Sequence, residues 1–145
     1  MIGSPDRLCI WAFSAGPIYG FRTAFRTAPP SIRCAIAYYG GMSLLNKTYF
    51  HYTEEEEPLF REFSPVCYLH EIPASIPPLF VARAALDRPF LNESIDEFVQ
   101  LAIAKNVPIT FINHPEGVHG FDMINDTERS REIIRATLEF IKEHL

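Results

Sequence analysis

Four short stretches of the chain are almost continuously apolar, and longer stretches of mixed polar and apolar residues lie between and after them. The apolar stretches cover residues 7–13, 32–38, 79–86 and 109–113. They are rich in Ile, Val, Phe, Ala and Leu, without a strict alternation of apolar and polar positions. Strands that are covered on both faces have this pattern, because both sides of each strand meet apolar neighbours. We therefore expect four parallel strands.

The mixed stretches are expected to form helices. Residues 15–27 can form one, since the proline near their start is tolerated in a first helical turn. Within residues 92–105, apolar side chains at helical spacing form one stripe, made of Ile95, Phe98, Val99 and Ala102. Residues 126–144 have the same pattern, with Asp126 or Thr127 as the N-cap. Together these elements predict an α/β fold with three layers, α/β/α, around a mostly parallel sheet of about four strands.

Residues 43–76 depart from this rhythm. They contain the acidic run Glu54–Glu57, several aromatic residues and no steady period. We interpret the acidic run as a solvated loop or helix start. The whole segment is predicted to be an irregular connection with short helices over one edge of the sheet, near the candidate site described below. No internal repeat is visible, so residues 1–145 are expected to form a single domain.

Composition narrows the classes of function. With 48% hydrophobic and 21% charged residues, the chain is typical of a globular protein. Its formal net charge of −5 argues against broad nucleic-acid binding and against a membrane-binding patch. No apolar stretch approaches the roughly 18 residues that a membrane span needs. The chain is therefore predicted to be cytoplasmic.

The three cysteines, Cys9, Cys34 and Cys67, form no CxxC motif. Cys9 and Cys34 lie within apolar runs, so we expect them to be buried free thiols in a reducing compartment. The five histidines have no paired spacing that would favour a metal site. Neither a metal nor another cofactor is predicted.

Ser14 is the first candidate for chemistry. It directly follows the first apolar run, in the sequence Ala12-Phe13-Ser14-Ala15-Gly16. This matches the nucleophile elbow G-x-S-x-G with alanine at the first glycine. At a sharp turn from strand to helix, larger side chains two residues before or after the serine would collide with the neighbouring elements. A serine that caps the following helix is the alternative interpretation.

Asp87 is the candidate acid, because it comes at the end of the third apolar run, and ligands of open α/β sheets bind beyond the carboxyl ends of strands. A turn aspartate is the alternative interpretation. Two other aspartates are weaker rivals: Asp96 lies within a predicted helix, and Asp122 follows His119 too closely to orient it from across a site.

His119 is the candidate base. It lies in a loop between Gly117 and Gly120, after the fourth apolar run, and can reach over the strand ends. His114 is its competitor but has less freedom, because it is followed by proline. The remaining histidines are interpreted as surface or packing residues: His51, His70 and His144.

Ser14, Asp87 and His119 each follow the end of a successive predicted strand, and parallel strands bring such ends to one edge of the sheet. The chain resembles the C-terminal half of an α/β-hydrolase, in the esterase and dienelactone-hydrolase-like branch. The resemblance covers nearly all 145 residues, and it rests on the elbow, on Tyr38-Tyr39-Gly40-Gly41, on Leu86-Asp87-Arg88-Pro89 and on His119-Gly120-Phe121-Asp122. Serine at the elbow favours the esterase side, since dienelactone hydrolases use cysteine.

The resemblance implies that Ser14 is the nucleophile, Asp87 the orienting acid and His119 the base, and that the Ala15 N–H is one oxyanion donor. In this fold the second oxyanion donor lies on a loop well upstream of the elbow. Only 13 residues precede Ser14, which are too few to include that loop. The first strand would then have one unpaired side. We expect a homodimer through that edge, an incomplete gene product or a fragment of a longer enzyme.

These observations predict a serine hydrolase that acts on small carboxylic esters through an acyl-enzyme. The alternative is a weak or inactive α/β-hydrolase remnant that serves as an interaction or assembly module. A peptidase of the prolyl-oligopeptidase type ranks lower, because nothing in the sequence resembles a propeller domain. The small ester is the expected partner, with no nucleic acid and no membrane.

Overall fold

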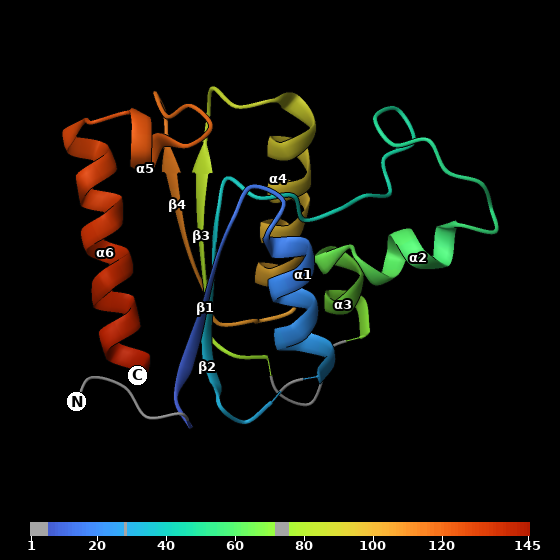
Figure 1. Ribbon diagram of the computed structural model, residues 1–145, viewed down its shortest axis with the longest axis horizontal. Coiled ribbons are helices and arrows are strands. Elements are labelled where there is room, and N and C mark those ends of the chain that lie inside the picture. The colour runs from blue at the N-terminus through green and yellow to red at the C-terminus, as the bar shows by residue number, and fades with distance from the viewer. Residues whose placement is uncertain (1–5, 28, 72–75) are drawn as a thin grey trace.

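The computed structural model describes residues 6–27, 29–71 and 76–145. Its strands form one parallel sheet in the order β1-β2-β3-β4, so that β1 and β4 are the edges (Figure 1). The strands are β1 (Leu8–Phe13), β2 (Ile32–Tyr38), β3 (Leu79–Ala84) and β4 (Ile109–His114). The predicted mostly parallel sheet of about four strands is confirmed.

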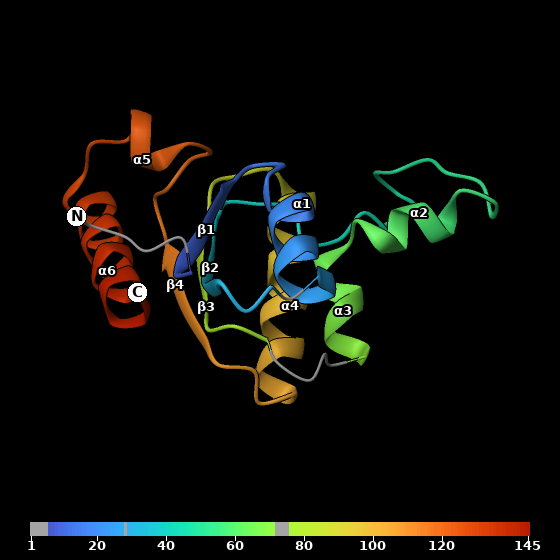
Figure 2. The ribbon, with the colours of Figure 1, turned by 60° about the horizontal axis from the view of Figure 1, so that its bottom comes forward.

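Helices cover both faces of this sheet, which confirms the three predicted layers (Figures 1 and 2). On one face lie α1 (Pro17–Arg22), α3 (Pro65–Glu71) and α4 (Pro89–Ala104). On the other lies α6 (Glu128–His144), preceded by the short α5 (Phe121–Ile124). The core is accordingly divided into two apolar clusters, one on each side of the sheet, with Phe21, Phe25 and Phe98 in the first and Tyr38, Phe80 and Phe121 in the second.

The helix predicted over residues 15–27 begins later and changes type. The turn at Ser14–Gly16 delays α1 until Pro17, which takes the first helical position. After Arg22 the chain continues as a π-helical turn, η1 (Thr23–Thr27). For α6, the structure selects Thr127 as the N-cap, because its side chain accepts a hydrogen bond from Ser130 N at 3.1 Å.

The irregular segment predicted over residues 43–76 contains α2 (Glu57–Glu62) and α3, while its residues 72–75 lie outside the described part of the chain. α3 packs against α1 and α4 and not over a sheet edge, whereas α2 projects away from the sheet (Figure 1). The beginning of the segment, at Ser43 and Leu44, reaches the cavity beside Ser14.

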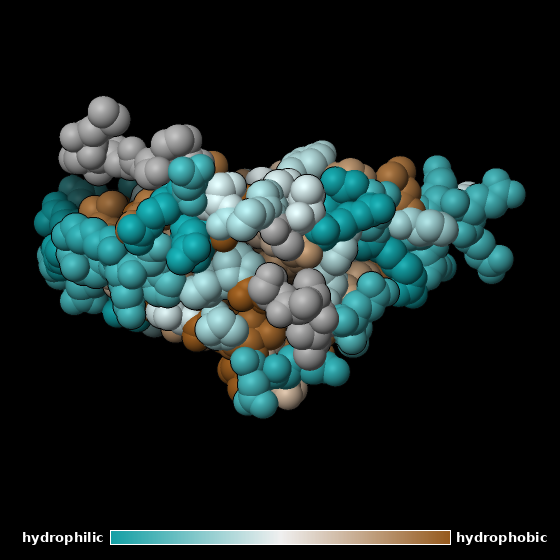
Figure 3. Space-filling view, turned by 90° about the horizontal axis from the view of Figure 1, so that it is seen from below, coloured by the Kyte–Doolittle hydropathy of each residue, from teal (hydrophilic) through white to brown (hydrophobic). Residues whose placement is uncertain are grey.

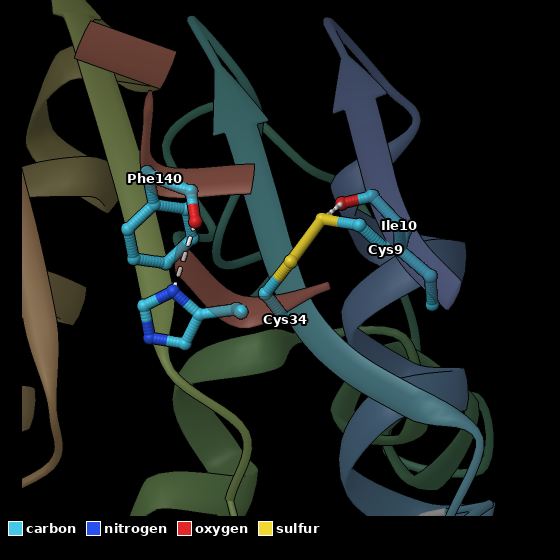
Figure 4. The surroundings of a disulfide bond; sticks show 5 residues. Cys9, Ile10, Cys34 and Phe140 are labelled. Carbon is cyan, nitrogen blue, oxygen red and sulfur yellow. Dashed lines mark hydrogen bonds between the residues drawn. A yellow bond between two sulfur atoms is a disulfide. The ribbon is translucent and has the colours of Figure 1, made fainter. Parts of the chain in front are cut away.

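The prediction that Cys9 and Cys34 are free thiols is wrong. They form a disulfide that joins β1 to β2 (Figure 4), and Cys67 is a free cysteine. The parallel register places Cys9 directly opposite Cys34, with their Cα atoms 4.8 Å apart, which is within the range that a disulfide bridges. Sequence alone does not supply this register. Disulfides persist in oxidising environments, so the Cys9–Cys34 bond removes the free thiols from which a reducing compartment was predicted.

The outward surface of α6 is hydrophilic, as the space-filling view shows at the left of Figure 3. Its buried side carries Ser130, Ile133, Thr137 and Phe140, which face the sheet. Among the described helices, none combines the length and the apolar character that a bilayer crossing requires.

Candidate active site

Ser14 occupies a sharp bend between β1 and α1. Its φ of 57° lies in the left-handed region, which residues with a side chain adopt only when their surroundings hold them there. Two backbone bonds provide that restraint: Ser14 N donates to Tyr38 O at 3.2 Å, and Gly41 N donates to Ser14 O at 3.0 Å. The serine is therefore presented on a bend that is tied to the end of β2.

The structure gives a steric reason for the small residues around Ser14. Gly16 N donates to Phe13 O at 2.7 Å, which closes the turn tightly. A Cβ at Gly16 would lie 2.9 Å from Phe13 O and 3.3 Å from Ala12 Cβ. Any side chain at position 16, or a larger one at position 12, would open the bend.

The three residues singled out from the sequence lie together. Ser14 Oγ is 2.9 Å from His119 Nε2, and His119 Nδ1 is 2.7 Å from Asp87 Oδ2. The Asp87 side chain is 1% exposed, and its second oxygen accepts a hydrogen bond from Arg88 N at 2.7 Å. With the carboxylate at Nδ1, the neutral imidazole carries its proton there and leaves Nε2 free to accept the serine proton.

The rival residues lie elsewhere. Asp96 binds Arg83, with Nε and Oδ1 2.8 Å apart. His114 is buried, and its Nε2 is 3.0 Å from Ser130 Oγ, on the side of α6. Burial lowers the pKa of His114 and keeps its imidazole neutral.

Sequence reasoning missed Tyr39, which supports His119. The two rings pack with centroids 4.8 Å apart, and the Tyr39 hydroxyl donates a hydrogen bond to Asp122 Oδ1. Burial raises the pKa of Tyr39 well above its ordinary value, and the bond to Asp122 raises it further, so the hydroxyl stays protonated. Tyr39 also has a positive φ of 39°. The available signals were its place directly after β2 and within the stretch Tyr38-Tyr39-Gly40-Gly41, but neither predicted its contact with His119.

The Ala15 N–H makes no backbone hydrogen bond within the described residues, and Ala15 lines a cavity with Ser14. That cavity has a volume of about 170 Å³. A larger hollow of about 720 Å³, near α3 and η1, contains none of the three residues. Within the part of the chain that is described, no three His, Cys, Asp or Glu side chains gather as metal ligands.

Comparisons with known proteins agree on the fold. No protein-family model and no curated protein matches the sequence, but solved structures do. Carboxyl esterase 2 from the fungus Tuber melanosporum matches with a TM-score of 0.77 and 15% identity, over 98% of this chain and 55% of that one. The esterase Est2 from Thermogutta terrifontis matches with a TM-score of 0.72 and 19% identity, over 96% and 55%.

The fold is that of the α/β-hydrolases. The acylaminoacyl peptidase of Pyrococcus horikoshii shares it, with a TM-score of 0.75 and 17% identity, over 99% of this chain and 25% of the peptidase. This chain therefore spans only part of each of these α/β-hydrolases, in agreement with the truncated fold predicted from the sequence. At sequence identities of 15% to 19%, this similarity establishes the fold alone.

Proposed function

We propose that the protein is a serine hydrolase of small carboxylic esters. One observation carries the proposal: Ser14, on a strained bend, is hydrogen-bonded to His119, which is hydrogen-bonded to the buried Asp87. A hydroxyl is a weak nucleophile by itself and needs an adjacent base that is oriented by a third group. The structurally similar esterases from Thermogutta terrifontis and Tuber melanosporum support this class of reaction.

The mechanism follows from the positions of these groups. His119 Nε2 takes the Ser14 proton as Oγ attacks the ester carbonyl, and the Ala15 N–H stabilises the oxyanion. His119 then gives its proton to the leaving alcohol, and the acyl group remains on Ser14. Water, deprotonated by the same imidazole, releases the carboxylic acid and restores the serine. Asp87 stabilises the imidazolium throughout.

A fluorophosphonate probe tests the proposal, since it phosphonylates only an activated serine. We expect it to label the wild-type chain and to fail on Ser14→Ala. Ser43→Ala is the matched control, because Ser43 lines the same cavity but lies away from His119 in the hydrogen-bond network. A folded wild-type chain that resists labelling would overturn the proposal.

A peptidase remains the lower-ranked candidate, favoured by the shared fold of the acylaminoacyl peptidase. The chain spans only 25% of that protein. Hydrolysis of a p-nitrophenyl ester with no release from peptide p-nitroanilides is the expected outcome. The reverse preference would favour the peptidase.

The free edge of the sheet at β1 favours a second candidate function, in which the protein assembles with another chain. We propose that β1 pairs with β1 of a second copy. The strand carries no charged residue to discourage pairing, and Leu8 and Phe13 are exposed. A two-fold pairing meets no charge repulsion along the strand and brings a second chain next to the elbow. Light scattering should detect a dimer, and a monomer at high concentration would contradict it.

A further inference from the structure

The cavity beside Ser14 is lined mainly by apolar side chains, and its polar side chains are Ser14, Ser43 and Arg88. Its walls are formed largely by Ile18, Leu44, Phe50, Phe90 and Leu91. Arg88 is the one titratable residue in the lining of this cavity. An apolar pocket with a single charged group is the usual form of a site that binds an apolar body with one polar end.

Arg88 differs from most arginines of the described chain in its bonding. Arg22 binds Glu62, Arg83 binds Asp96, and Arg131 binds Asp126. The guanidinium of Arg88 has no hydrogen bond or ion pair with any described residue; only its backbone N–H is used, by Asp87. Its five donors are therefore available to a ligand.

The backbone position of Arg88 adds to this. It is the N-cap of the 16-residue helix α4, where Ser, Thr, Asp or Asn would satisfy the free N–H groups. Its side chain makes no cap bond, and the first turn of α4 has no acidic residue. The buried carboxylate of Asp87 already accepts a hydrogen bond from Arg88 N at this helix end, while the Arg88 guanidinium adds a positive charge there that no described side chain pairs.

The cavity lies on the acyl side of the reaction. His119 must protonate the departing alcohol, so the alcohol lies against His119. The cavity is lined by Ser14 and Ala15, the nucleophile and the oxyanion donor, while His119 is not among its lining residues. The group that stays on Ser14 is therefore the one that enters the cavity.

We infer that the substrate is an ester whose short acyl chain ends in a carboxylate, which Arg88 binds. This inference rests on the proposed hydrolase function and specifies its substrate class. A cavity of about 170 Å³ accommodates an acyl chain of a few carbons, since a cavity of about 150 Å³ holds benzene. Half-esters of succinic or glutaric acid have this size and charge.

Two ethyl esters of the same length test the inference: monoethyl glutarate, and ethyl 4-carbamoylbutanoate, in which an uncharged amide replaces the carboxylate. Arg88→Met removes the charge and keeps a long side chain. We expect it to lower kcat/KM for the glutarate ester by about 10- to 100-fold, the range of a charge-assisted hydrogen bond. The amide ester should lose activity by a smaller factor, because its uncharged oxygen is attracted less strongly to the guanidinium than a carboxylate is. Arg33→Met, which removes an exposed cation on β2, is the control.

The outcomes separate the two proposals. Equal losses on both esters would overturn the role of Arg88 in recognising the carboxylate while leaving the hydrolase standing. If neither ester is hydrolysed and the fluorophosphonate fails to label Ser14, the hydrolase proposal falls. Calorimetry with glutarate then decides the anion site by itself: binding that Arg88→Met abolishes supports it, and no binding to the wild-type chain overturns it.

Discussion

The hydroxyl of Tyr39 donates a hydrogen bond to the carboxylate of Asp122, 83 residues later in the chain. Tyr39 follows β2 and Asp122 belongs to α5, while His119 lies in the loop between β4 and α5. Because the Tyr39 ring also packs on the His119 ring, this bond fixes the loop that carries the imidazole. We interpret Tyr39 and Asp122 as positioning residues for His119.

Replacement of Tyr39 by phenylalanine is expected to lower kcat by about 10- to 100-fold with little change in KM, because small displacements of a base are costly. Asp122→Asn keeps an acceptor oxygen and should retain most of the activity. The double variant Tyr39→Phe/Asp122→Ala should have the same kcat as Tyr39→Phe alone, because both substitutions remove the same hydrogen bond. Additive losses, or a change confined to KM, would contradict this role.

A methyl group at position 16 should destabilise the elbow. Gly16→Ala places its Cβ 2.9 Å from Phe13 O, within backbone that cannot easily move. We expect a loss of about 1–3 kcal/mol in the free energy of unfolding, measured by chemical denaturation. Gly41→Ala is the matched control, because its Cβ would lie 3.7 Å from Leu91 Cδ2, an ordinary contact. Equal stability of the two variants would refute the steric argument.

Reduction of the disulfide should destabilise the fold. Cys9 and Cys34 are separated by 25 positions, and closing a loop of that length stabilises by about 3 kcal/mol in the chain-entropy model. The denaturation midpoint is expected to fall when a reductant is added, and Cys9→Ala/Cys34→Ala should show no further response to it. Cys67→Ala, which removes the free thiol, should keep the response. A wild-type midpoint that is insensitive to reductant would count against the disulfide.

His114 should make stability depend on pH. Burial lowers its pKa in the folded state, so the unfolded chain binds the proton more readily. Its contribution is fully present above the ordinary histidine pKa of about 6.5 and is lost as pH falls below that value. His114→Gln, which keeps a donor toward Ser130, should lose less unfolding free energy than the wild type between pH 8 and pH 5. An identical loss in both proteins would contradict the assignment.

Local pattern was sufficient for the strands. The apolar run over residues 32–38 has the same bounds as β2. A strand that is buried on both faces needs apolar side chains at consecutive positions, so the run itself shows where the strand begins and ends. Ser14, Asp87 and His119 could be selected for a related reason: each follows a strand end, and a parallel sheet gathers those ends. The first residue of helix α1 could not be predicted from the sequence, because its late start depends on the bend at Ser14.

By itself, the sequence determined the α/β class, the parallel sheet and the three candidate residues, all of which depend on short-range patterns and on the general rules of strand order. Only the tertiary structure decided the Cys9–Cys34 bond, the contact of Tyr39 with Asp122 and the place of Arg88 beside the cavity. Each of these depends on strand register or on the packing of segments far apart in the chain. Periodicity describes which face a residue occupies, but not which distant residue it meets there.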